Sequence, residues 1–137
     1  MPRPPVAIVL TAALAAAMSL TACGKSDEDQ VRDVVTRFAQ ATARKDYQQI
    51  CDDLIARRLA ETVEEFGLPC EQAFRTGLGA VRYPRLQIVR VRLKKDKALV
   101  TVRTSASNQM PSTDTLQLVR EDGSWRIAAL AAGRRQR

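Results

Sequence analysis

The chain has 137 residues, of which 45% are hydrophobic and only 4% aromatic, and it carries a formal net charge of +7. This length allows one domain and a targeting segment, with a core built from aliphatic side chains. The sequence contains no histidine, so it lacks the commonest general base, metal ligand and pH switch of proteins. We expect neither a metal site nor a cofactor.

The N-terminus has the pattern of an exported lipoprotein. Arg3 precedes the apolar run "VAIVLTAALAAAMSL", which has the length of a signal-peptide core and is shorter than the ~20 residues of a transmembrane helix. The run leads into "LTAC", which resembles a bacterial lipobox. By that resemblance residues 1–22 are a signal peptide, and acyl chains on Cys23 anchor the protein in the membrane. The alternative is an ordinary cysteine after an uncleaved anchor; either way the rest of the chain is extracytoplasmic.

Residues 23–30 contain no apolar residue after the cysteine and predict a short lipidated tether.

Cys51 and Cys70 are the two remaining cysteines, 19 positions apart. Disulfides persist outside the cytoplasm, so we predict that these two pair, at a value of roughly 3 kcal/mol. The alternatives are two buried thiols or a reactive pair. One straight helix through this region would hold the cysteines too far apart, so a break near Ala56–Leu59 is also predicted.

The first half of the mature chain has helical periodicity. Apolar residues at helical spacing predict helices over residues 27–46, 47–59 and 70–79. Asp46 is placed to cap the second helix at its N-terminus, and Gly67 and Pro69 end the helical pattern before the third.

The second half alternates apolar and polar residues, as strands do. We predict strands over residues 86–93, 98–104, 113–120 and 125–130, a polar loop or edge-strand end over 105–112, and a disordered basic tail over 131–137. Val89, Val91 and Leu93 are expected on one face, with Leu86 and Ile88 out of phase through a bulge or through apolar contacts on both faces. Three helices followed by four strands predict an α+β fold with an antiparallel sheet.

Three stretches resemble the NTF2-like superfamily. They are the helix pair "VVTRFAQATARKDYQQICDDL", the third helix "LPCEQAF" and the final hairpin "LVREDGSWRIAAL". The resemblance implies an NTF2-like domain over residues 31–130, a cone in which three N-terminal helices pack on a curved four-stranded antiparallel sheet. It also implies that the first cysteine of the third helix pairs back to the second helix. Small lipoproteins of this kind are common in actinobacteria.

Cones of this superfamily often hold a small ligand between helices and sheet. The pattern places eight apolar or aromatic residues around such a candidate pocket: Phe38, Tyr47, Leu54, Phe74, Val91, Val102, Leu118 and Trp125. The simpler interpretation is that these side chains fill a closed core.

A second interpretation is a cofactor-free, SnoaL-like enzyme that works by acid–base chemistry, such as an isomerase or dehydratase. Its candidate groups are Asp46 with Tyr47, or Asp52 with Asp53. The sequence departs from the catalytic relatives, which usually place a histidine in the cone. Capping by Asp46 and solvent exposure of Asp52 and Asp53 are simpler, so we expect a non-catalytic module.

The positive charge gathers on the predicted strands and turns. It comes from Arg82, Arg85, Arg90, Arg92, Lys94, Lys95, Lys97, Arg103, Arg120 and Arg126, with Arg134, Arg135 and Arg137 behind. A solvated outer face is the plain interpretation; the functional one is attraction to anionic lipid or acidic wall polymers. A membrane-protein partner or a homodimer through the sheet is the other candidate partner. Nucleic acid is disfavoured, because the protein is expected to be exported and this face lacks stacking aromatic residues.

Overall fold

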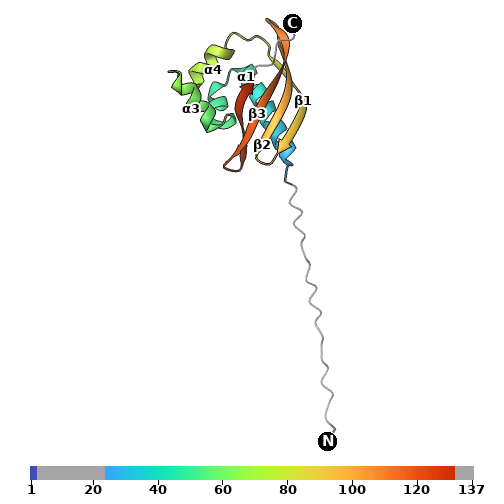
Figure 1. Cartoon of the computed structure of the whole chain (residues 1–137). Coiled ribbons are helices and arrows are strands. Elements are labelled where there is room, and N and C mark those ends of the chain that lie inside the picture. The colour runs from blue at the N-terminus through green and yellow to red at the C-terminus, as the bar shows by residue number, and fades with distance from the viewer. Residues whose placement is uncertain (3–23, 132–137) are drawn as a thin grey trace.

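The computed structural model describes residues 1–2 and 24–131 (Figure 1). The signal-peptide residues 3–22, the lipidation residue Cys23 and the tail residues 132–137 lie outside the described residues. Helical segments precede a four-stranded antiparallel sheet in the order β1-β2-β3-β4. This arrangement confirms the predicted α+β class. Within residues 24–131, no helix is long and apolar enough to cross a membrane.

Helix α1 spans Asp27–Arg44 and begins in the charged segment after the predicted signal peptide. The Ser26 side chain accepts a hydrogen bond from the backbone N–H of Asp29 at 3.1 Å, and acidic residues fill the first turn. Both features stabilise a helix N-terminus. The last four residues of the predicted tether, 27–30, are therefore part of the helix. One face of α1 is buried, formed by Val31, Val34, Val35, Phe38 and Ala41.

The second predicted helix is divided, as the cysteine spacing requires. Helix α2 (Tyr47–Gln49) continues into the π-helix η1 (Ile50–Leu54), and α3 (Arg57–Glu65) follows after a break at residues 55–56. Helix α4 spans Cys70–Leu78. The predicted disulfide joins Cys51 and Cys70, whose Cα atoms lie 6.1 Å apart.

The break between η1 and α3 is held by the sheet. Ile55 forms a parallel bridge with Ile127, and the Ala56 N–H donates to the Ile127 carbonyl at 2.8 Å. This extended pair of residues covers part of the edge of β4, which would otherwise present unpaired backbone groups. The helical pattern gives way here because the extended backbone gains partners on the sheet.

The sheet consists of β1 (Arg85–Lys94), β2 (Lys97–Ala106), β3 (Gln109–Glu121) and β4 (Ser124–Ala131). The helices lie against its inner face only, and α1 contacts both β1 and β4 (Figure 1). The described core lies wholly between residues 31 and 127. A chain that begins at Gly24 therefore contains every core residue and the disulfide.

Two details of the sheet differ from the sequence-based expectation. The register between β1 and β2 shifts between Ile88 and Arg90, which confirms the bulge offered as one explanation for the change of phase; Val89 is its extra residue and is 58% exposed. Its predicted place on one face with Val91 is wrong, because an inserted residue reverses the alternation. Residues 105–112 were predicted as a polar loop or an edge-strand end, and the loop is wrong: the ends of β2 and β3, which are inner strands of the sheet, fill this segment and leave only residues 107–108 as a turn.

Candidate functional site

A small cavity lies at one end of the cone. Its volume is about 190 Å³, and its walls come from α1, from the segment between α4 and β1, and from the ends of β1, β2 and β3 next to the β2–β3 turn. The lining residues are Phe38, Ala39, Thr42, Leu78, Val81, Pro84, Arg85, Leu86, Thr104, Ser105, Ala106, Gln109, Met110 and Ser112. Ligand sites commonly combine such an apolar wall with a few placed polar groups.

Two hydroxyl groups of the cavity wall, those of Thr104 and Ser112, form a connected trio with Asp114 on the inner face of β2 and β3. The Ser112 hydroxyl donates to Oδ2 of Asp114 at 2.7 Å, and the Thr104 hydroxyl donates to the same oxygen at 3.0 Å. The two hydroxyl oxygens lie 2.8 Å apart. Since the two hydroxyl protons are shared among these three contacts, the trio uses both of them internally and presents oxygen lone pairs to the cavity.

The loop that closes one side of the cavity is fixed by a side chain of the β2–β3 turn. The Asn108 amide accepts from the Arg82 N–H at 3.0 Å and donates to the Ala80 carbonyl at 2.8 Å. The Ser107 N–H also donates to the Arg82 carbonyl at 2.9 Å. These bonds hold the segment that carries Val81 and Pro84 over the cavity.

The eight residues of the candidate pocket occupy two different places. Phe38 lines the cavity. Tyr47, Leu54, Phe74, Val102, Leu118 and Trp125 are buried members of the core cluster, and Val91 packs against it, partly buried. The cavity is thus built mostly from residues that the sequence pattern did not single out.

The acids of the enzyme interpretation do not come together in the cavity. The Asp46 carboxylate accepts from the Gln49 N–H at 3.0 Å and caps α2, as predicted. The Tyr47 hydroxyl is buried and has no hydrogen-bond partner within residues 24–131. Asp52 and Asp53 are exposed, and Asp53 lies 3.9 Å from Arg37. The described groups therefore form no acid–base pair, and the enzyme interpretation is not favoured.

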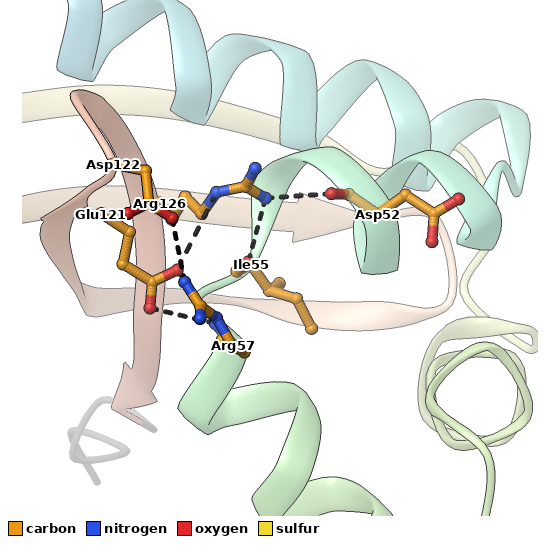
Figure 2. A network of polar contacts seen from close by, with 6 residues as sticks. All are labelled: Asp52, Ile55, Arg57, Glu121, Asp122 and Arg126. Atoms are coloured by element: carbon orange, nitrogen blue, oxygen red, sulfur yellow. Dashed lines mark hydrogen bonds and ion pairs between the residues drawn. The ribbon is translucent and has the colours of Figure 1, made fainter.

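Two arginines assigned to the basic face serve the fold instead. Figure 2 shows Arg126 reaching from β4 to the end of η1, where it donates to the Asp52 carbonyl at 3.0 Å. Its Nε lies 3.9 Å from Glu121, whose carboxylate accepts from the Arg57 N–H at 3.1 Å (Figure 2). Glu121 thereby caps α3, because the residue before this helix, Ala56, has no side chain that can.

Arg120 connects the first turn of α1 with the β1–β2 turn and with β4. Its guanidinium lies 2.6 Å from Asp27 in α1, 3.4 Å from Asp96 in the β1–β2 turn, and 4.7 Å from the centroid of the Trp125 ring. The hydrogen bond from Arg120 lowers the pKa of Asp27, and the same bond raises the pKa of Arg120. Arg120 and Arg126 are therefore engaged in ion pairs, in contrast to the cations of β1 and β2.

A second depression, of about 640 Å³, lies beside the disulfide and is open to solvent. Its walls mix apolar surface with charged residues, which include Asp52, Glu64, Glu71 and Arg75. No group of metal-ligating side chains forms within the described ranges. The smaller cavity is the better candidate site, because apolar enclosure stabilises a bound molecule more than an open charged hollow does.

Comparison with known proteins identifies the family. The family model described as "Putative lumazine-binding" matches residues 26–131. No curated protein matches the chain.

Solved structures show the fold. An NTF2-like protein of unknown function from Silicibacter pomeroyi is 19% identical, with a TM-score of 0.53 over 74% of this chain and 89% of that one. A second, from Shewanella baltica, is 12% identical, with a TM-score of 0.56 over 78% and 94%. A de novo designed NTF2 fold protein is 15% identical, with a TM-score of 0.53 over 77% and 87%. The chain therefore belongs to the "Putative lumazine-binding" family and has the NTF2-like fold.

Proposed function

We propose that this protein is a membrane-anchored, extracytoplasmic lipoprotein whose cone binds a small molecule without transforming it. The observation that supports ligand binding is the 190 Å³ cavity with a polar trio in an otherwise largely apolar wall. The anchor is supported by the lipobox resemblance at Cys23. The domain would thus hold its ligand close to the membrane surface.

The size and the polarity of the cavity restrict the ligand. Pockets for drug-sized ligands measure roughly 300–1,000 Å³, so this smaller cavity fits a compact molecule and excludes a lipid tail. Its polar wall offers lone pairs from Thr104 and Ser112, because both of their protons are used within the trio with Asp114. A matching ligand carries N–H or O–H donors on a flat or compact apolar body.

The family description names lumazine, a bicyclic heteroaromatic molecule with ring N–H donors. Lumazine has the donors and the compact shape that the cavity requires, and its fluorescence reports binding directly. It is therefore a suitable probe for the site.

Filling the cavity should abolish binding without harming the fold. Ala39 lines the cavity from α1, and leucine is a good helix former. We expect Ala39→Leu to weaken lumazine binding at least about tenfold, since the added side chain occupies the ligand's volume. Ala43→Leu makes the same change on an exposed turn of α1 and should bind as the wild type does. Fluorescence titration of the three proteins measures both effects.

The polar wall supplies a second arm of this test. Thr104→Val keeps the shape of the side chain and removes its hydroxyl, whereas Thr104→Ser keeps the hydroxyl. The valine variant should bind more weakly than the serine variant. Equal binding by wild type, Ala39→Leu and Thr104→Val would show that lumazine binds elsewhere, and no binding by the wild type would remove lumazine as a ligand of this cavity.

The anchor is tested by the mass of the protein purified from its own membrane. We expect a denatured mass equal to residues 23–137 plus acyl chains, less two hydrogens for the disulfide. Under native conditions an additional mass that is lost on denaturation would identify the natural ligand. An uncleaved and unmodified chain would contradict the lipoprotein assignment.

A further inference from the structure

The outer face of β1 and β2 is a cationic surface. The two strands contain six basic residues and no acidic one: Arg85, Arg90, Arg92, Lys94, Lys97 and Arg103. All six are exposed. None of them forms an ion pair with any residue that the structure describes, whereas Arg120 and Arg126 on β3 and β4 do. The charge of this face is therefore not neutralised by the rest of the domain.

Apolar side chains lie among these cations. The bulge turns Val89 outward, where it is 58% exposed, and Leu99 is 45% exposed opposite Arg92. Exposed apolar side chains are unfavourable in water. At the boundary between headgroups and acyl chains they are buried favourably, while the neighbouring basic side chains contact the headgroups. This mixture favours a lipid surface over a soluble polyanion, which would contact only the charges.

The start of α1 lies at one end of this face. Arg120 contacts both Asp27 in the first turn of α1 and Asp96 in the β1–β2 turn, so the two turns are neighbours. The chain between Cys23 and Asp27 spans at most ~14 Å. A lipid on Cys23 would therefore hold Lys94 and Lys97, which flank that turn, next to the headgroups.

We propose that the outer face of β1 and β2 docks the domain onto anionic phospholipid headgroups. The location of this contact rests on the proposed anchor, but the contact itself needs only the face. In this docked arrangement the cavity lies at the β2–β3 turn, which is the opposite end of the strands from the β1–β2 turn (Figure 1). The ligand site would thus remain accessible from the side away from the anchor.

A homodimer through the same face is disfavoured by its charge. A two-fold interface sets each surface against a copy of itself, so the cations of one face would meet those of the other. No acidic residue of β1 or β2 can pair with them. An anionic surface supplies the missing opposite charge.

The test uses a chain that begins at Gly24, which has the whole core and no lipid, so its outcome does not depend on the anchor. It is sedimented with vesicles of phosphatidylcholine, alone or with phosphatidylglycerol. We expect binding to the anionic vesicles at low salt and release at high salt, because salt screens exposed charges. Replacing Arg90, Arg92, Lys94 and Lys97 by glutamine should weaken binding about tenfold or more.

The matched control removes the same four charges from the helices, as Arg32→Gln, Arg37→Gln, Arg44→Gln and Arg58→Gln. It should retain the binding of the wild type, and circular dichroism should show all variants folded. An equal loss of vesicle binding in both variants would mean that binding depends only on the net charge of the domain, and would overturn the assignment to this face. Absence of binding at low salt, or binding to a soluble polyanion but not to vesicles, would overturn the lipid partner.

Discussion

Replacing Trp125 by alanine is expected to lower the free energy of unfolding by about 3–5 kcal/mol. Trp125 is 3% exposed on β4, and its ring supports the Arg120 guanidinium that pairs with Asp27. Alanine would leave a cavity at this end of the core and remove the surface on which Arg120 rests. Since small domains are stable by only about 5–15 kcal/mol, this change should bring the domain close to unfolding. Urea denaturation measures the loss.

Trp125→Phe is the control, with an expected cost of about 1–2 kcal/mol. The indole N–H is buried and has no hydrogen-bond partner in the described part of the chain. It nevertheless contributes to lowering the pKa of the nearby Asp27 carboxyl, after the larger effect of Arg120. Phenylalanine retains most of the packing and removes a polar atom that gains little from its surroundings. A phenylalanine variant as unstable as the alanine variant would show that the indole N–H contributes more than packing does.

Removing the disulfide is the second change with a large expected effect. The Cys51–Cys70 bridge closes a loop that contains α3, and such a loop is worth roughly 3 kcal/mol. The double variant Cys51→Ala, Cys70→Ala should lose about this amount. Helix α3 has no fully buried residue and meets the core only through the partly buried Leu59 and Ala60, so the bridge and the cap from Glu121 help to hold it in position.

Reduction provides the matched measurement for the disulfide. In a chain that begins at Gly24, a thiol reductant should destabilise the wild type about as much as the double substitution does. The double variant itself should not respond to reductant. A wild type whose urea midpoint is the same with and without reductant would contradict a stabilising role for the bridge.

The fold followed from the sequence because periodicity and covalent reach constrain it strongly. The change from helical spacing to alternation gave the order of helices and strands, and the cysteine spacing required a break that the structure has at Ile55 and Ala56. The phase of Val89 could not be read in this way. An alternating pattern fixes a face only while the register is unbroken, and the bulge at this residue breaks it.

The site was harder to predict because its polar groups come from separate strands. Asp114 lies two and four positions before the buried residues Leu116 and Leu118, so its alternation alone places it on the inner face. A polar residue in phase with an apolar stripe indicates a functional position, and that signal was present. The role of Asn108 could not be deduced, because it depends on a loop 26 positions away in the sequence.

The contact between Asp27 and Arg120 joins residues 93 positions apart. The hydrogen bonds from the Ala56 N–H to Ile127 and from the Arg57 N–H to Glu121 also join residues that are far apart in the sequence. Closing such long loops costs conformational entropy, and the contacts that offset this cost form only when the last hairpin is in place. A chain that emerges with its N-terminus first would therefore expose the apolar face of α1 until β4 arrives. Completion of the core is coupled to the final strand, so a chain cut before Ser124 should not fold in part but remain unfolded.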